Sequence, residues 1–358
     1  MSVLDDVQAY EIWLRTCCDV VEEGLREKHR RMAKDALKFL RATCFRFART
    51  LPRYLPELAT APRVPSVGDA HIENFGTWRD AEGRLVWGVN DFDDAAVLPA
   101  TYDLVRLATS ARLAPGIAGA PDDRADWILM GYQRGLETPR PWIVDGAQPW
   151  MPALLGRTMT GFGNVDDAAS AVIGAAEVPA EVLDGFSTHL PPGTGALVYR
   201  KRQRGGGSLG RPRYLAMGIW RGGPVCREAK ALVPSAWDWA AGTPGVPGQS
   251  LALASGPYRS PDPFLSLTAG YLIRRIAPDS EKIDLTASVS AAFSGDVLAA
   301  MGSDLAAIHL SGGIDPALLR ADLRTRKKAW LADAARRAAE EVAVDFDTWR
   351  AHWKLVSG

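Results

Sequence analysis

Two carboxylates and an amide stand near one another between Gly68 and Asp94, and their types suit metal-dependent chemistry. Asp69 is followed five residues later by Asn74, and Asp91 then begins an Asp-Phe-Asp run. Carboxylate and amide oxygens are ligands for a hard cation such as Mg²⁺, which keeps several of its waters. In phosphoryl transfer of the kinase type, an Asp in such a loop orients the attacking hydroxyl, while an Asn and a second Asp hold magnesium. The spacing predicts Asp69 as the catalytic base, with Asn74 and Asp91 as ligands of Mg²⁺.

A predicted hairpin explains how these residues can meet. The segments Thr77–Arg79 and Leu85–Val89 have strand character and are joined by a turn that contains Gly83. The hairpin would fold the chain back, so that Asp91 returns to the neighbourhood of Asn74. The alternative is an ordinary loop, because Asp and Asn are frequent turn residues.

Three further polar residues are expected to assist this site. If the chain after Asp91 is extended, Asp93 lies on the same side of it and is a further candidate metal ligand. His71 lies within the predicted catalytic loop and is expected to support its structure. Asp103 starts an amphipathic helix, where it would act as a cap and also bond the backbone of the catalytic loop.

A glycine-rich loop between two predicted strands lies far downstream. The strands are Ala196–Arg200 and Tyr214–Trp220, and a third strand, Val225–Lys230, follows after a turn. Glycine lets backbone N–H groups approach phosphate oxygens and form an anion-binding concavity. The candidate phosphate-binding residues of this loop are Gly205, Gly206, Gly207, Ser208 and Gly210. Lys230, at the end of the third strand, is predicted to pair with phosphates as the strand lysine of a kinase small lobe does.

The order of these segments is the reverse of that in ordinary kinases, where the glycine loop precedes the catalytic loop. Apolar spacing predicts a helix over Arg31–Leu51, a strand over Tyr271–Ile276 and a helix over Asp296–His309. A circular permutation accounts for this order and costs nothing chemically if the same residues converge. The predicted fold class is α+β: a two-lobed, protein-kinase-like fold, circularly permuted, with a small antiparallel β lobe late in the chain.

The permutation also predicts how the chain is divided. Residues 1–190 would form the large, mostly helical lobe with the catalytic loop and the metal-binding hairpin. Residues 191–284 would form the small, β-rich nucleotide-binding lobe, and residues 285–358 would return to the large lobe as helices.

Several motifs also resemble a known family. The chain is similar to an uncharacterised bacterial family, domain of unknown function 2252, from about residue 31 to about residue 313, in the motifs GDAHIENFG, VNDFDDA, YDLVRLATS, GGGSLGRPRY and REAKALVPSAW. That family is similar to the aminoglycoside-phosphotransferase branch of protein-kinase-like folds, so the resemblance implies a nucleotide-dependent transferase and no particular substrate. Longer members have Lys where this chain has Arg227, so either Lys230 or Arg227 would meet the phosphates. Lys230 is favoured because it shares a strand face with Glu228.

Composition narrows the possible partners and the compartment. The chain has 42 basic and 42 acidic residues, which gives no overall attraction to nucleic acid or to an anionic membrane. Its four cysteines form no C-x-x-C pair, which favours a reducing compartment. No signal-peptide pattern and no apolar run of about 20 residues occurs, so a cytoplasmic protein is expected. The sequence does not indicate an oligomeric state.

The predicted function is phosphoryl transfer from ATP and Mg²⁺ to a hydroxyl of a small-molecule acceptor. The acceptor is not indicated, because residues 115–190, where its pocket is expected, contain no assignable motif. Three alternatives remain: nucleotidyl transfer on the same scaffold with the nucleotide reversed, a nucleotide-binding pseudokinase or regulatory module, and a metal-dependent hydrolase built from Asp69, His71 and Asp91.

Overall fold

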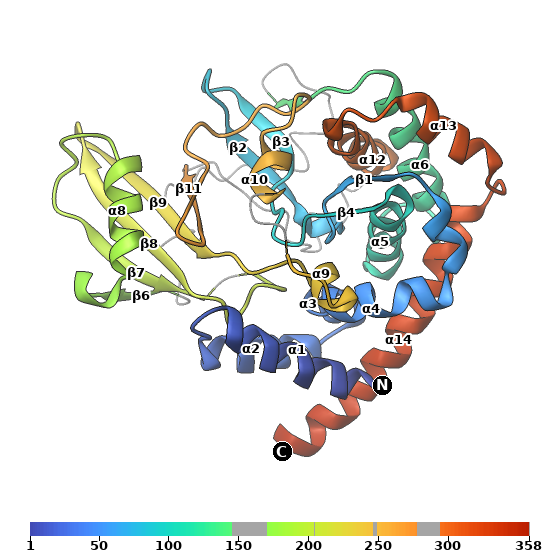
Figure 1. Ribbon diagram of the computed structural model, residues 1–358, viewed down its shortest axis with the longest axis horizontal. Coiled ribbons are helices and arrows are strands. Elements are labelled where there is room, and N and C mark those ends of the chain that lie inside the picture. The colour runs from blue at the N-terminus through green and yellow to red at the C-terminus, as the bar shows by residue number, and fades with distance from the viewer. Residues whose placement is uncertain (145–169, 204, 246–248, 278–293, 358) are drawn as a thin grey trace.

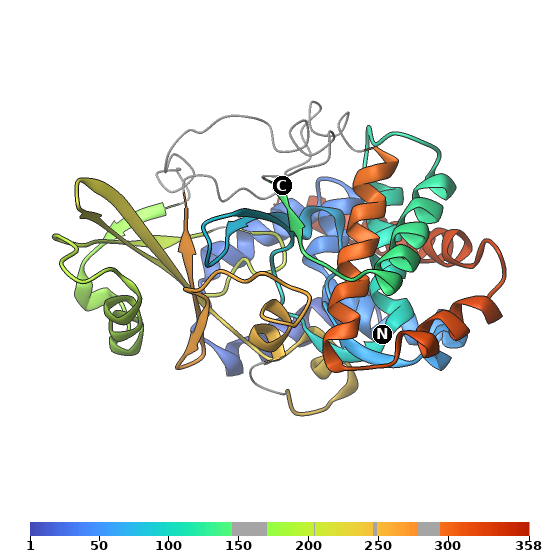
Figure 2. The same ribbon diagram turned by 90° about the horizontal axis from the view of Figure 1, so that it is seen from above.

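The computed structural model describes residues 1–144, 170–203, 205–245, 249–277 and 294–357, and it shows a mixed α+β protein. A six-stranded antiparallel sheet lies on one side of the molecule, and a mostly helical body lies on the other (Figures 1 and 2). The predicted α+β class is therefore confirmed. In the described ranges, no helix is long and apolar enough to cross a membrane.

The helices are α1 (Val3–Cys17), α2 (Glu22–Met32), α3 (Ala36–Ala42), α4 (Cys44–Tyr54), α5 (Ala100–Leu113), α6 (Pro121–Glu137), α8 (Ala180–His189), α9 (Ala236–Ala241), α10 (Gln249–Ala254), α12 (Gly295–His309), α13 (Pro316–Thr325) and α14 (Trp330–Ser357). The strands are β1 (Arg63–Ser66), β2 (Phe75–Arg79), β3 (Leu85–Val89), β4 (Ala96–Pro99), β5 (Trp142–Ile143), β6 (Ser170–Ile173), β7 (Val198–Arg202), β8 (Arg213–Trp220), β9 (Gly223–Ala231), β10 (Ser266–Thr268) and β11 (Tyr271–Ile276).

The helical body is built around α5, α6, α12 and α14, which share one apolar core. Helices α6 and α12 approach so closely that a Cβ atom on Gly302 would lie 2.0 Å from the carbonyl oxygen of Ile128. Glycine is required there because no side chain fits between the two backbones. The helix predicted over Asp296–His309 is confirmed as α12.

The single helix predicted over Arg31–Leu51 is wrong, because the chain there forms the end of α2 and then α3 and α4. The side chain of Asp35 caps α3 by accepting the backbone N–H of Lys38. The hydroxyl of Thr43 donates to the carbonyl of Phe39 at 2.7 Å, and the chain turns at Thr43 before α4 begins. Short polar side chains that bond the local backbone compete with helix continuation, and apolar spacing alone does not detect them.

The six-stranded sheet has the order β10-β11-β9-β8-β7-β6, and every adjacent pair is antiparallel. Helix α8 covers one face, where Val182 and Phe186 join Ala229 and Ile273 in a separate apolar cluster. The predicted strands around the glycine loop and at Tyr271–Ile276 are confirmed. Strand β6 and helix α8 also belong with this sheet, although they precede residue 191, the predicted start of the small lobe.

Helix α9 packs on the helical body, although it falls within the predicted small-lobe segment. The ring of Trp237 stacks on Tyr102 with centroids 5.2 Å apart, and its Nε1 donates to the carbonyl of Gly68 at 2.9 Å. The chain between β9 and β10 therefore crosses to the helical body before it returns to the sheet.

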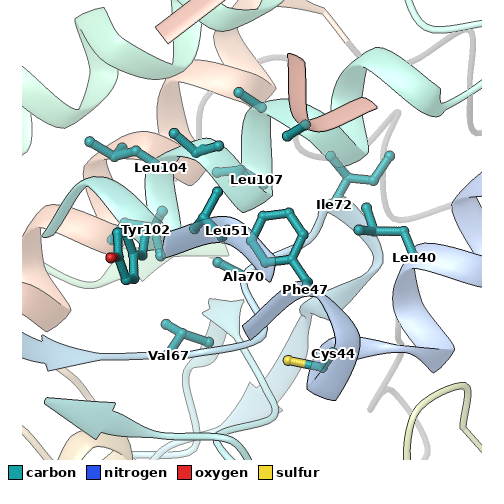
Figure 3. Close-up of a cluster of buried hydrophobic side chains, with 14 of the residues drawn as sticks. Leu40, Cys44, Phe47, Leu51, Val67, Ala70, Ile72, Tyr102, Leu104 and Leu107 are labelled. Carbon is teal, nitrogen blue, oxygen red and sulfur yellow. The ribbon is translucent and has the colours of Figure 1, made fainter. Parts of the chain in front are cut away.

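A buried apolar cluster supports the loop that contains Asp69. Val67, Ala70 and Ile72 point into this cluster together with side chains of α4 and α5 (Figure 3). Asp69 and His71, which alternate with these residues, line the pocket described below. The apolar residues therefore fix the backbone of the loop and leave the two polar side chains for the pocket.

Candidate active site

A cavity of about 480 Å³ lies between the sheet and the helical body. Its volume falls within the range that is typical of small-molecule sites. It brings together most of the residues that the sequence predicted, namely Asp69, His71, Asn74, Asp91, Asp93, Gly205, Gly206, Gly207, Ser208 and Lys230. The two predicted groups, which lie far apart in the sequence, thus meet in one pocket.

Asp103 holds the backbone just before Asp69. Its carboxylate accepts the N–H groups of Val67 at 2.7 Å and of Gly68 at 2.9 Å. His309 Nε2 lies 3.1 Å from the same carboxylate, so α12 is tied to the loop as well. The expected contact of Asp103 with the loop backbone is therefore present, but its predicted role as a helix cap is wrong, because α5 begins at Ala100 after Pro99 and Asp103 lies within the first turn.

Asp69 forms an ion pair that the sequence analysis missed. Arg106, which is fully buried, donates from Nε to Asp69 Oδ1 at 2.7 Å. The other oxygen, Oδ2, lies 3.8 Å from His71 Nε2 and would lie 3.8 Å from a Cβ atom on Gly207. Arg106 therefore fixes one oxygen of the carboxylate and leaves the other facing the glycine loop. Arg106 is three residues after Asp103 and so lies on the same face of α5, which is the signal that could have identified it.

Asn74 and Asp91 meet as the predicted hairpin requires. Strands β2 and β3 pair in register, and the N–H of Asn90 donates to the carbonyl of Asn74 at 2.9 Å. The Nδ2 group of Asn74 donates to the carbonyls of Asp69 at 3.1 Å and of Asp91 at 2.9 Å. Its buried Oδ1 has no hydrogen-bond partner among the described residues. A buried amide oxygen that lacks a donor fits the role of a ligand for a hard cation.

Lys230 connects the sheet to this acidic group. Its Nζ lies 3.0 Å from Asp91 Oδ1 and 2.6 Å from Asp93 Oδ1. Arg211 contacts the other oxygen of Asp93 at 3.1 Å. Burial and the charge of Asp91 raise the pKa of Asp93, against the opposing effect of Lys230 and Arg211. Asp93 thus binds two cationic side chains in the structure, whereas the sequence predicted it as a metal ligand.

Arg227 is not among the residues that line the pocket. Its Nε donates to the carbonyl of His189 at 2.9 Å, and its guanidinium lies 4.2 Å from the centre of the Phe264 ring. Successive residues of a strand point to opposite faces, so Lys230 faces the pocket and Arg227, three residues earlier, faces away. Of these two candidates, Lys230 is therefore the one that lines the pocket.

Gly210 does not line the pocket either. It has a φ of +93°, and a Cβ atom there would lie 2.6 Å from Leu25 Cδ2. Its carbonyl accepts the N–H of Val21 at 2.8 Å. Gly210 therefore anchors the end of the glycine loop to α2, while residues 205–208 face the cavity.

The glycine loop rests on the helical body. Arg31 Nη1 donates to the carbonyl of Gly205 at 3.0 Å. A Cβ atom on Gly207 would lie 3.1 Å from the carbonyl oxygen of Arg41. The loop therefore passes beside Asp69 with little space for a side chain, which places backbone groups next to the carboxylate.

A second set of possible metal ligands lies behind the loop. Ligand atoms of Cys44, Asp69 and Asp94 lie within 4.8 Å of one another. Burial raises the pKa of the Cys44 thiol well above its usual value, so the thiol stays protonated. One oxygen of Asp94 accepts the N–H of Ala236 at 2.8 Å. A thiol is a soft ligand that suits a hard cation poorly, so the oxygens of Asn74 and Asp91 are the better candidates for binding one.

Three arginines surround a buried carboxylate on the pocket side of the sheet. Glu228 is fully buried; it lies 3.0 Å from Arg213, 2.6 Å from Arg274 and 3.4 Å from Arg202. Burial alone would raise the pKa of Glu228, but Arg213, Arg274 and Arg202 outweigh it and hold the pKa well below its usual value. Arg202 and Arg213 belong to the basic stretches that flank the glycine loop in the sequence, whereas no sequence pattern indicated Glu228 or Arg274 as part of the site.

Comparison with known proteins supports the family resemblance over part of the chain. Residues 20–138 match the model of a family described as an uncharacterised protein conserved in bacteria, DUF2252. The matched segment contains Asp69, Asn74, Asp91 and Arg106 and ends before the glycine loop. No curated protein and no solved structure matches the chain.

Proposed function

We propose that this protein is an ATP- and Mg²⁺-dependent transferase that moves a phosphoryl group to a hydroxyl of a small molecule. One observation carries the proposal: Lys230 Nζ lies 3.0 Å from Asp91 Oδ1, although the two residues are 139 positions apart in the sequence. The contact joins the glycine-loop strands to the acidic loops, which is the combination that phosphoryl transfer requires.

The pocket has two walls, the acidic loops on the helical body and the glycine-loop strands of the sheet, and each has a distinct role in this proposal. Asp69 orients the acceptor hydroxyl with Oδ2 and takes its proton as the new O–P bond forms and the bond to the leaving ADP breaks. Arg106 keeps the Asp69 carboxylate in place from behind. Lys230 and the backbone of residues 205–208 hold the phosphates of the nucleotide.

The donor set fits Mg²⁺. The Oδ1 of Asn74, which has no hydrogen-bond partner in the described part of the chain, and the carboxylate of Asp91 are hard oxygen ligands, and Asp91 already faces the cation of Lys230. When bound there, Mg²⁺ would neutralise charge on the phosphates. Asp93 would become available as a ligand only if Lys230 turned from it toward the phosphates.

We further propose that the fold is a circularly permuted, kinase-like one. The sheet that carries the glycine loop and Lys230 comes after the acidic loops in the chain, and α12 follows the sheet and packs beside α6. This order is the one that a permutation predicts. The four unpaired cysteines are consistent with a cytoplasmic location.

Nucleotidyl transfer is the second candidate, because the arginines around Glu228 give the sheet wall an unusually cationic surface. In that reaction the nucleotide would lie reversed, and the products would be an AMP-modified acceptor and pyrophosphate. A pseudokinase or regulatory role is less favoured because the candidate base and metal ligands are all in the pocket.

The test is a mass analysis of ATP that has been incubated with the protein, Mg²⁺ and a bacterial metabolite extract. The proposal predicts ADP and an acceptor heavier by one phosphoryl group, with both signals lost in Asp69→Asn. Formation of AMP and pyrophosphate instead would establish nucleotidyl transfer. Release of phosphate with no modified acceptor, unchanged in Asp69→Asn, would contradict both.

A further inference from the structure

The cationic surface around Lys230 continues along the sheet. Arg213 on β8 lies directly opposite Lys230 on β9, and Arg274 on β11 lies directly opposite Glu228. Glu228 is two residues before Lys230 and therefore on the same face, about 6.5 Å along the strand. The pocket wall next to Lys230 thus carries guanidinium groups from three strands, with Arg202 on β7 as the third.

This part of the wall has more positive than negative charge. Arg213 and Arg274 share the carboxylate of Glu228. Asp91 and Asp93 also act on Arg274, but they are paired with Lys230 and Arg211. The Arg213 side chain is 6% exposed and that of Arg274 is 21% exposed. Burial of unbalanced charge is costly unless a counter-ion is bound. Both arginines line the cavity, so a bound anion could reach them.

The same surface offers a ligand mainly charge, which suits an anion better than the apolar face of a nucleotide base. A base presents apolar faces, and ligand pockets cover such faces with apolar side chains. Most of the apolar lining of this cavity lies away from the arginines, at Trp78, Val89, Phe92, Ala254, Pro261 and Leu265, although Leu272 and Ile276 flank Arg274 on β11. The wall at Arg213 and Arg274 is therefore suited to an anion, and the planar guanidinium groups match the geometry of phosphate oxygens.

We propose that Arg213 and Arg274, with Arg202 beside them, form a phosphate-binding subsite next to that of Lys230. Its importance for catalysis rests on the proposed transferase function, whereas anion binding at the subsite does not. The phosphate has two chemical sources. It is either the terminal phosphate of a nucleotide whose base lies on the apolar lining, or a phosphate carried by the acceptor.

The first experiment measures binding of inorganic tripolyphosphate by calorimetry, without Mg²⁺ or nucleotide. Arg274→Gln should weaken binding by about tenfold or more, which is the scale of one charged hydrogen bond. Lys201→Gln is the matched control, because it removes a charge from β7 at a side chain that is 46% exposed and absent from the pocket lining. Should Arg274→Gln not fold, Arg213→Gln makes the same test from another strand.

Equal tripolyphosphate affinities for the wild type and both folded arginine variants would overturn the proposal. That result would leave the proposed function intact, because ATP and Mg²⁺ could still bind through Asp91 and Lys230. Conversely, loss of tripolyphosphate binding in Arg274→Gln would support the subsite even in a protein that transfers no phosphoryl group.

A second experiment identifies the source of the phosphate. Orthophosphate is titrated into protein saturated with ATP and Mg²⁺. If orthophosphate still binds and Arg274→Gln abolishes this binding, the subsite takes a phosphorylated acceptor. If ATP excludes orthophosphate, and Arg274→Gln weakens ATP and ADP but not AMP, the subsite takes the tail of the nucleotide. If orthophosphate and every nucleotide bind equally to the wild type and Arg274→Gln, the subsite does not exist.

Discussion

The two walls of the pocket are held in different ways. On the helical body, Asn74 bonds the carbonyls of Asp69 and Asp91, so the backbone of the acidic loops is fixed within a short stretch of chain, and Arg106 then holds the Asp69 carboxylate. On the sheet, Lys230 and Glu228 are fixed by ion pairs to residues from distant strands and loops. Where the backbone itself is fixed, the reactive groups are placed rigidly. Where ion pairs hold the side chains, the positions of those side chains depend on the balance of charge around them. Changes in the first should therefore affect turnover, and changes in the second should affect ligand affinity and stability.

The largest effect is expected for Asp69→Asn. If Asp69 takes the proton of the acceptor, its loss should lower turnover by roughly 10²- to 10⁴-fold while the affinity for ATP and Mg²⁺ is nearly unchanged. The amide keeps the shape of the side chain, but the buried Arg106 loses its counter-charge, so denaturant unfolding of the variant is compared with that of the wild type. The measurement compares product formation and calorimetric ATP binding in the two proteins. A turnover equal to that of the wild type would remove Asp69 from the chemistry.

Glu228→Gln should give the largest loss of stability. The change leaves Arg213 and Arg274 without their carboxylate, and breaking a buried ion pair costs about 3–5 kcal/mol. Denaturant unfolding at neutral pH measures this loss. Tripolyphosphate should increase the free energy of unfolding of the variant more than that of the wild type, because the anion replaces the missing charge.

The contribution of Glu228 to the stability of the fold should depend on pH. The folded-state pKa lies well below the ordinary value of 4.5, so the stabilisation is complete above pH 4.5 and is lost as the pH falls through the folded-state pKa. The difference in unfolding free energy between the wild type and Glu228→Gln should therefore narrow below pH 4.5. A difference that stays constant down to acid unfolding would show that the pKa of Glu228 is not lowered.

Lys230 and Arg227 provide a matched pair on one strand. Lys230→Met should weaken ATP binding by roughly 10- to 100-fold, because one charged contact to the phosphates is removed. Arg227→Met removes the same charge from the opposite face and should leave ATP binding unchanged. Calorimetric titration of both variants is the measurement. The reverse pattern would mean that Arg227 reaches the phosphates and that the strand faces are assigned wrongly.

Gly210 and Gly206 should differ in how much stability is lost when each is replaced by alanine, and this is the smallest of the expected effects. Gly210→Ala should lower stability by about 1–3 kcal/mol, because an alanine at a φ of +93° is strained and its Cβ would press on Leu25. Gly206→Ala meets only the end of the Arg41 side chain, at 3.4 Å, so its stability should change little. Thermal unfolding of the two variants tests the difference. Equal destabilisation would contradict the separate roles of the two glycines.

The acidic half of the site was predictable because its determinants are local. The loop around Asp69, the β2–β3 hairpin and Asp91 lie in one short segment, and turn residues with alternating apolar residues were sufficient to predict that they converge. Asp103 was also recognised. Arg106 was missed although it lies one turn after Asp103 on the same face of α5, because this spacing alone does not show that the side chain reaches Asp69.

The sheet half was predictable in part. The tight turn between β8 and β9 pairs Trp220 with Gly223, and counting back from it would have placed Arg213 opposite Lys230. No local pattern could have placed Arg274 opposite Glu228, because β11 is separated from β9 by two helices and a long connection. Gly210 and Arg227 were included in the site because motif membership does not show where a residue points.

The most direct test of the account is a calorimetric titration of ATP, with and without Mg²⁺, into the wild type and Asp91→Asn. Asp91 is the residue where the two walls meet, and Lys230 keeps Asp93 as a partner at 2.6 Å when the Asp91 charge is removed, so the fold should persist. Asp262→Asn is the control, because Asp262 lines the same pocket and pairs with Arg275 at 3.3 Å. The account predicts that Mg²⁺ strengthens ATP binding in the wild type and in Asp262→Asn and has no effect in Asp91→Asn. Equal strengthening by Mg²⁺ in all three proteins would contradict it.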